Sequence, residues 1–202
     1  MNKVFCTLDP HRLGASLELS QGNLVVSTTK VCDFQRSVFG SIALGVGNAS
    51  FEGYVYSQSR PSAGLIDLFA IGVAEVGAAL DQVIGDETEP TTSALPMSVA
   101  LRPMCQDSGG TFAGIYAGGV LLQRLQAIDE RQCISVFRYG DVLAPKVSFS
   151  VNGNYLATAD LVPGRFYVPA GSLGSSASPT DVAAYFNFGQ RGLNFPNLTI
   201  DV

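Results

Sequence analysis

The sequence has little charge, and most of what it has is acidic. Of its 202 residues, 12 are Lys or Arg and 17 are Asp or Glu, which gives a formal net charge of −5. The only lysines are Lys3, Lys30 and Lys146. A nucleic-acid interface needs clustered cations that meet the phosphates. The composition therefore disfavours nucleic acid as a partner.

Long apolar runs are also missing. No stretch approaches the ~18 apolar residues that indicate a membrane-spanning helix, so membrane insertion is not expected. Asp9 and Arg12 interrupt the first apolar run of the chain. This run is therefore too short to be the apolar part of a secretory signal peptide. We therefore expect synthesis in a cytoplasm without a signal peptide. Hydrophobic residues still make up 47% of the chain, so it can fill a core and disorder is not expected.

The residues that build metal sites and nucleophilic sites are scarce. The four cysteines, Cys6, Cys32, Cys105 and Cys133, form no Cys-x-x-Cys pair. Zinc and thioredoxin-like chemistry are therefore disfavoured, and buried reduced thiols are expected. His11 is the only histidine, so any Ser–His or Cys–His arrangement would have to use it, and we interpret it as an exposed polar residue.

No Glu-x-Asp or Glu-x-Glu pair lies on an expected strand, and the two glutamates that are two positions apart, Glu87 and Glu89, lie in the acidic stretch Asp86-Glu87-Thr88-Glu89-Pro90. Its composition is typical of a surface turn, and 86–96 is expected to be a long surface loop. A glycosidase needs two carboxylates that flank the scissile bond, and calcium needs several oxygen ligands. The glutamates are interpreted as solvated charges, so we expect no enzyme, no metal and no cofactor.

Short β-type runs separated by turn residues fill the chain. Val147–Val151 alternates apolar residues with serine, and Asn152-Gly153 follows directly. Asn-Gly between two such runs predicts a tight hairpin, because a type I′ turn needs positive φ at both central residues. Weak helical patterns lie at 74–83 and 120–128. The remaining strands are expected at 17–20, 24–26, 41–46, 51–56, 65–74, 133–139, 155–157, 166–168 and 183–188. Many short strands with frequent turns predict one all-β sandwich or barrel over 1–202.

Several segments, in matching order and spacing, resemble the SPRY family. The opening of the chain, Leu8-Asp9-Pro10 with 19–24, is similar to SPRY domains of tailed-phage and bacterial proteins. The other segments are Phe51-Glu52-Gly53-Tyr54-Val55-Tyr56, Ile71-Gly72-Val73-Ala74, Val147-Ser148-Phe149-Ser150-Val151-Asn152-Gly153, Phe166-Tyr167-Val168-Pro169-Ala170 and Asn187-Phe188-Gly189-Gln190. The resemblance covers roughly residues 7–196.

The resemblance implies a fold and a role. The fold is a concanavalin-like sandwich of two antiparallel sheets, with long loops and little helix. The role is non-catalytic binding of proteins or peptides through loops at one edge. The chain departs from the family in having no Trp, in having Arg131-Gln132 where a Gly-Asp pair is usual, and in having Ser135 where Gly is usual. These departures affect the loops rather than the fold.

Candidate binding residues are aromatic or basic residues expected at loop edges, because binding hot spots favour Tyr, Trp and Arg. Arg60-Pro61 leads, since it follows the run at 51–56 in a loop of Ser, Gln, Gly and Pro. The full set is Arg60, Pro61, Tyr116, Arg138, Tyr139, Tyr155, Arg165 and Phe166.

Three functions remain open. The first is a bacteriophage virion component, namely a fibre, tail or capsid decoration protein that assembles as a homo-oligomer or within a larger particle. The phage-like opening and the low charge favour it. The second is a lectin-like protein that stacks Tyr116, Tyr139 or Tyr155 on a surface glycan. The third is a cytoplasmic adaptor that binds a peptide.

Overall fold

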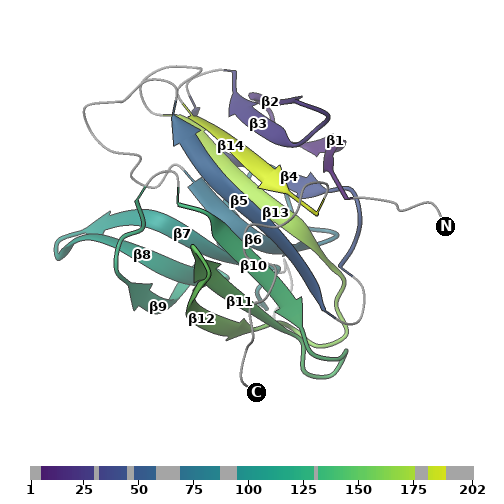
Figure 1. The fold of residues 1–202 in the computed structure, drawn as a ribbon, viewed down its shortest axis with the longest axis vertical. Coiled ribbons are helices and arrows are strands. Elements are labelled where there is room, and N and C mark those ends of the chain that lie inside the picture. The colour runs from purple at the N-terminus through teal and green to yellow at the C-terminus, as the bar shows by residue number, and fades with distance from the viewer. Residues whose placement is uncertain are drawn as a thin grey trace.

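A computed structural model describes residues 6–29, 32–44, 48–57, 69–86, 95–129, 132–175 and 182–189. Within these ranges the chain forms fourteen β-strands and no helix (Figure 1). The strands form two seven-stranded sheets whose neighbouring strands are antiparallel. The expectation of an antiparallel two-sheet β-sandwich is confirmed.

Each sheet combines strands from both halves of the chain. Sheet A contains, in spatial order, β1 (Leu8–Leu13), β4 (Cys32–Gly40), β13 (Tyr167–Ser175), β6 (Phe69–Glu75), β7 (Ser98–Asp107), β8 (Gly110–Ala117) and β9 (Val120–Leu125). Sheet B contains β12 (Asn154–Asp160), β11 (Lys146–Val151), β10 (Ile134–Tyr139), β5 (Ala49–Ser57), β14 (Val182–Asn187), β3 (Val25–Thr28) and β2 (Leu17–Ser20).

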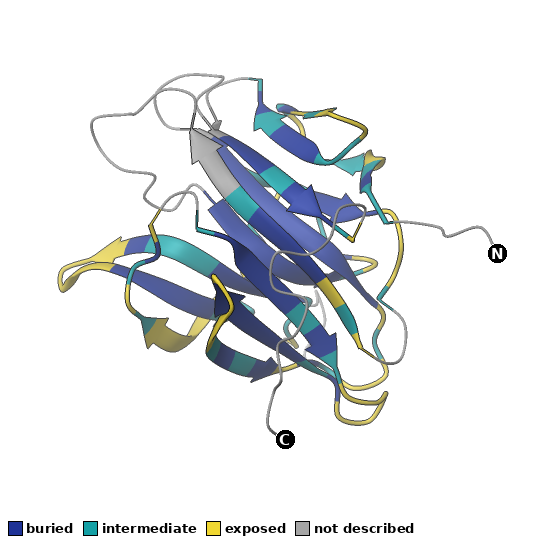
Figure 2. Ribbon diagram, viewed as in Figure 1, coloured by how far each residue is buried: buried dark blue, intermediate teal, exposed yellow. Residues whose placement is uncertain are grey.

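The main core lies between the two sheets. Alternate residues of a strand point to the same face, and the inward-pointing set is apolar. Phe51, Ile71, Leu101, Phe149 and Leu173 are among its buried members. Buried residues run along the middle of both sheets and exposed ones gather in the turns (Figure 2). Burial of this apolar surface is the main force that holds the sheets together.

A second apolar cluster lies on the outer face of sheet A, under residues 76–86, which we call the strap. Ala78 and Ile84 of the strap pack with Phe39, Ala74 and Val168 of the sheet. The strap has no regular structure, so its backbone groups need partners elsewhere. Much of that pairing comes from the sheet's outward-facing serines, described below.

The Asn-Gly hairpin is confirmed. Asn152 and Gly153 have φ of 49° and 81° and connect β11 to β12. The Asn152 side chain also attaches this turn to the start of β10. Its Oδ1 accepts a 3.0 Å hydrogen bond from the backbone N–H of Cys133, the residue before that strand.

Other expectations were wrong. Residues 74–83 are not helical, since β6 ends at Glu75 and the strap follows, and 120–125 form β9 instead of a helix. The run at 41–46 is not a strand in its described part, because β4 ends at Gly40 and Leu44 makes only an isolated bridge with Tyr167. β6 begins at Phe69, and residues 65–68 lie outside the described ranges. Among the described elements, β1, β4, β7 and β8 were not predicted as strands.

Candidate binding surface

Three segments bring apolar side chains to one end of the sandwich. They are the start of the strap, the turn between β10 and β11, and the turn between β12 and β13 (Figure 1). Backbone hydrogen bonds join them: Val76 N–H donates to Phe166 O at 3.1 Å, and Gly164 N–H donates to Val142 O at 3.0 Å. The segments therefore hold fixed positions relative to one another.

Four large apolar side chains at this end are exposed. The exposed fraction is 80% for Leu143, 65% for Phe166, 48% for Val76 and 42% for Val142. We call Val76, Val142, Leu143 and Phe166 the crest. Single exposed apolar residues are ordinary, but several on adjoining segments make this end of the sandwich a candidate interaction surface.

The turn that presents Leu143 is held by a side chain. Asp141 Oδ1 accepts hydrogen bonds of 2.8 Å from both the Leu143 and the Ala144 backbone N–H groups. Gly140 precedes it with φ of 83°, a conformation that glycine adopts without steric cost. Leu143 is thus exposed on an ordered turn and not on a loose one.

The alternation of β13 explains the exposure of Phe166. Tyr167, the first residue of the strand, is 2% exposed, and its neighbour Phe166 points the other way. Tyr167 Oη accepts a 3.0 Å hydrogen bond from Val162 N–H. Burial raises the pKa of the Tyr167 phenol, with the carboxylate of Glu75 adding to the rise, so this hydroxyl stays protonated at neutral pH.

Arg165, beside Phe166, is already engaged. Its Nη1 donates to Glu75 Oε1 at 2.9 Å, and both side chains are partly buried. This ion pair connects the β12–β13 turn to the end of β6. The predicted contact residue therefore has a structural partner, while Phe166 remains free to meet a ligand.

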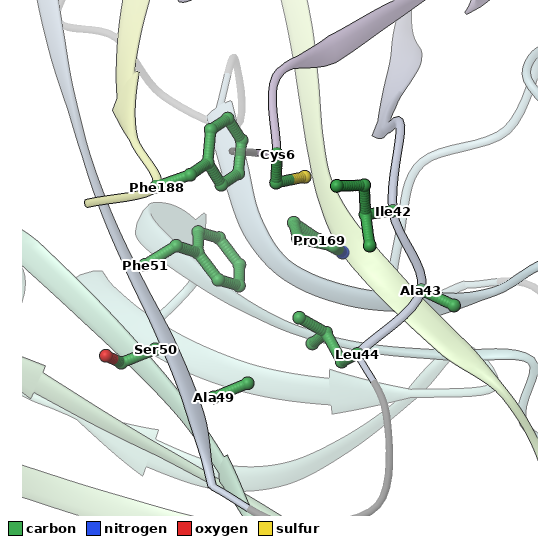
Figure 3. A pocket seen from close by; sticks show the side chains of 9 residues that line it. All are labelled: Cys6, Ile42, Ala43, Leu44, Ala49, Ser50, Phe51, Pro169 and Phe188. Atoms are coloured by element: carbon green, nitrogen blue, oxygen red, sulfur yellow. The ribbon is translucent and has the colours of Figure 1, made fainter. Parts of the chain in front are cut away.

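A pocket of about 270 Å³ is lined by residues of β5 and β13 and of the segment after β4 (Figure 3). Leu44 on its wall bridges to Tyr167, the neighbour of Phe166. The pocket is lined by Cys6, Ile42, Ala43, Leu44, Ala49, Ser50, Phe51, Pro169 and Phe188. Burial is the main cause that raises the pKa of the Cys6 thiol, so the thiol is neutral. The lining suits an apolar side chain.

The other predicted residues are dispersed. Arg60 and Pro61 lie outside the described residues. Tyr116 lies on β8 over the outer face of sheet A, with the Arg102 guanidinium 4.2 Å from its ring centroid. Tyr139 and Tyr155 lie on β10 and β12, and the Tyr155 hydroxyl donates to Thr158 Oγ1 at 3.2 Å.

Arg138 requires a correction, because it is not at a loop edge. It lies on β10 and is 4% exposed. Its register partners, Val147 and Ala49, are on the flanking strands, and Val147 belongs to the main core. Nη1 donates to Gly140 O at 3.0 Å, so Arg138 supports the turn that precedes Leu143.

Of the residues predicted from the sequence, Phe166 belongs to the crest and Arg165 lies beside it, whereas Val76, Val142 and Leu143 were not among the predicted residues. A signal was present, since Val142-Leu143-Ala144 places three apolar residues in a short connection between two strong strands. Turns usually carry polar residues, Gly or Pro.

Neither a metal-ligand cluster nor a membrane-spanning helix is found among the described residues. No group of three or more His, Cys, Asp or Glu residues among them could hold a metal ion. In the same part of the chain, no helix has the length and apolarity to cross a membrane. His11 is exposed on β1, next to Asp9, whose Oδ1 accepts its backbone N–H at 2.9 Å.

The fold is similar to solved SPRY domains. The TRIM65 PSpry domain superposes with a TM-score of 0.63 at 14% identity, covering 91% of this chain and 92% of that one. The SPRY domain of human HERC1 gives a TM-score of 0.58 at 14% identity, covering 91% of this chain and 99% of the HERC1 domain. The stonustoxin structure gives a TM-score of 0.52 at 17% identity, covering 91% of this chain and 27% of the stonustoxin chain.

These similarities define the class of fold. The chain has a SPRY-type β-sandwich fold, as the sequence motifs predicted. No family model matches the sequence, and neither does any curated protein sequence. The likeness therefore concerns the fold, and function has to be argued from the surface.

Proposed function

We propose that this chain is a non-catalytic recognition module that binds a protein partner through the crest. The observation that carries the proposal is the exposure of Leu143 and Phe166 on two ordered, hydrogen-bonded turns at one end of the sandwich. Preorganised apolar side chains lose little conformational entropy on binding. The pocket lined by Leu44 and Pro169 supplies a separate concave site for one apolar side chain of the partner.

The charges around the crest indicate the chemistry of the partner. Arg165 is paired with Glu75, and Asp141 is bonded to backbone N–H groups. The surface therefore offers apolar contact more than ionic contact. We expect a partner segment with large apolar side chains, and an affinity that changes little with ionic strength.

Site-specific crosslinking tests the proposal. A photoreactive phenylalanine analogue at Leu143, used in the native host cell, should capture a defined protein. The same analogue at Leu122, an exposed residue of β9, is the matched control and should not capture it. Equal capture from both positions would contradict the assignment of the binding surface to the crest.

The captured partner, once purified, allows a quantitative test. Leu143→Ser and Phe166→Ser should each weaken its binding about 10- to 100-fold, the range expected of hot-spot residues. Leu122→Ser should leave the affinity unchanged. A partner that binds all three variants as tightly as the wild type would overturn the proposal.

The virion role is a finer form of the same proposal. The phage-like opening of the sequence and the low charge support a fibre, tail or capsid decoration protein, for which the crest would be the contact to the particle. Co-sedimentation with purified particles tests it: the wild type should sediment with them and Leu143→Ser should not. A wild type that stays in the supernatant would favour the cytoplasmic adaptor.

A lectin-like role depends on a different surface. Tyr155 is 55% exposed on β12, and its hydroxyl is oriented by Thr158, so its ring is available to stack on a sugar. A glycan array compares the wild type with Tyr155→Ala. A glycan-binding signal that is lost in Tyr155→Ala and retained in Leu143→Ser would support this candidate. The absence of any signal at millimolar protein concentration would exclude it.

A further inference from the structure

A row of buried polar residues crosses the outer face of sheet B. Asn187, Glu52, Ser135 and Ser150 follow one another as register partners on the adjacent strands β14, β5, β10 and β11. Their neighbours along the strands, such as Phe51, belong to the main core, so these four side chains point away from it. They are nevertheless only 4%, 2%, 3% and 0% exposed. Another part of the chain therefore covers this polar row.

The polar row needs hydrogen-bonding groups from whatever covers it. Ser135 Oγ and Ser150 Oγ are buried and have no hydrogen-bond partner among the described residues. The same holds for the hydroxyl of Tyr185, which lies two residues before Asn187 on the same face. Buried polar groups are as a rule hydrogen-bonded, and a buried carboxylate such as Glu52 is stabilised most by a cation. The cover should therefore supply both.

The chain that follows β14 starts at the polar row. Asn187 is the last residue of β14, and its Oδ1 accepts a 3.1 Å hydrogen bond from the backbone N–H of Gly189. Gly189 has a φ of 91°, which glycine adopts without steric cost. Because the Asn187 side chain points to the outer face, this turn directs the chain onto that face.

Among the segments outside the described residues, 190–202 fits the position and the length. Residues 58–68 and 176–181 join β5 and β14 at their opposite ends, and 87–94 leads from the strap to β7 of sheet A. The remaining stretches have at most five residues. Four adjacent strands are ~19 Å wide, and five extended residues span only ~17 Å. Thirteen residues span up to ~43 Å.

We propose that residues 190–202 lie across the outer face of sheet B, with the guanidinium of Arg191 on the carboxylate of Glu52. Arg191 is the only cation of this segment. It follows Gly189 by two residues, which is enough to reach the neighbouring strand β5. The backbone of the segment offers N–H and C=O groups to the buried hydroxyls. This face is thereby closed to a partner, unlike the crest.

Thiol labelling of the full chain tests this inference. In Ser135→Cys, N-ethylmaleimide should modify position 135 slowly, because the segment covers it; mass spectrometry of peptides measures the rate. Adding Arg191→Glu places like charges together and should speed this labelling at least ~10-fold. Lys3→Glu, the same change at the other end of the chain, is the matched control and should leave the rate unchanged.

The native thiol of Cys105 shows whether the fold as a whole has loosened. It is 2% exposed in sheet A and should react slowly in every variant. An unchanged rate at position 135 on adding Arg191→Glu would overturn the proposal. So would an equal rise at Cys105, which means general unfolding, or an equal effect of Lys3→Glu.

A double-mutant cycle tests the ion pair itself. Glu52→Gln and Arg191→Gln should each lower the midpoint of thermal unfolding by at least ~5 °C, because each leaves a buried charge alone. The double variant should lose less than the sum of the two. Arg191→Lys keeps the charge and should lose less than Arg191→Gln. Losses that simply add would show that the two residues act independently, which overturns the pairing.

Discussion

The strap and the β10–β11 turn are both irregular segments that carry apolar side chains, but they orient these side chains oppositely. The strap turns Ile84 and Ala78 onto sheet A, where they are 0% and 8% exposed. The β10–β11 turn directs Leu143 into solvent, at 80%. The difference lies in where each backbone finds its hydrogen bonds.

The strap obtains its hydrogen bonds from the sheet. Ile84 N–H donates to Ser172 Oγ at 2.9 Å, and Gly85 N–H donates to Ser98 Oγ at 2.7 Å. Ser37 Oγ donates to Gln82 O at 2.5 Å and lies 2.7 Å from Ser172 Oγ. Buried serines thus hold residues 82–85 of the strap against the sheet, and Ile84 is covered as a result, whereas Val76 at the start of the strap belongs to the exposed crest.

Two arginines complete the attachment of the strap. Arg12 Nη2 donates to Val76 O at 2.7 Å while its guanidinium lies over the Phe39 ring, and Arg36 Nη1 donates to Asp81 O at 3.0 Å. The β10–β11 turn instead closes on its own Asp141 and on the adjacent turn. The β10–β11 turn thus combines an ordered backbone with an uncovered Leu143, as the proposed binding surface requires, whereas Ile84 and Ala78 of the strap are buried.

The largest expected effect is on the strap. Ile84→Ala leaves a cavity under it and should reduce the free energy of unfolding by ~2–5 kcal/mol, the usual cost for a buried isoleucine. Chemical denaturation measures this. Binding of a partner to the crest should be unchanged in the folded variant, and a loss of only a few tenths of a kcal/mol would show that the strap is loosely attached.

Ser172→Ala should come next. The change removes the acceptor of the Ile84 N–H and the neighbour of the Ser37 hydroxyl, both buried, and an unsatisfied buried group costs ~1–3 kcal/mol. Hydrogen exchange should accelerate at 82–85 and remain slow at 140–145. Uniform acceleration over both segments would contradict the separate anchoring of the two regions.

Asp141→Ala should have a smaller effect on stability, and its main effect should be on recognition. It removes an acceptor of two backbone hydrogen bonds at a solvent-exposed turn, for which ~1 kcal/mol is expected. The turn would lose its preorganisation, so affinity for the partner captured at the crest should fall several-fold with Leu143 still present. Asp141→Asn, which keeps the acceptor oxygen, is the control and should retain most of that affinity.

Leu143→Ser should change stability least. A substitution at an exposed site away from special features usually stays within about 0.5 kcal/mol. Thermal unfolding should match that of the wild type while partner binding falls. A clear loss of stability would mean that Leu143 belongs to the packed structure, and the contrast with Ile84 would then disappear.

The fold could be predicted where strands carry local signals. Val147–Val151 alternates and is followed by Asn-Gly, so β11, the turn and the start of β12 were found. β9 was mistaken for a possible helix because its three consecutive apolar residues do not alternate with polar ones. These residues are exposed, so their apolar character does not come from a buried face of the sheet. β7 contains Pro103, and β4 mixes polar and apolar residues without alternation, so pairing with neighbouring strands defines both.

The binding surface was harder to predict. Arg165 and Phe166 were selected by residue type, which gives no information about partners, so the Arg165–Glu75 pair was not foreseen. Arg138 was selected for the same reason, but its direction depends on the register of β10 with β5 and β11. Leu143 was missed because a single sequence shows that a turn is apolar but not whether the rest of the fold covers it.

The strand order also affects how the protein is made. β13 is the link between β4 and β6, and β14 is the link between β3 and β5. Both are late in the chain, so the first strands of each sheet cannot join the others until residues 167–187 have left the ribosome. Until then, the nascent chain exposes unpaired strands and apolar faces, which favours slow folding and aggregation. We expect synthesis of this protein to depend on chaperones that hold the incomplete chain, and truncation before β13 to yield insoluble product.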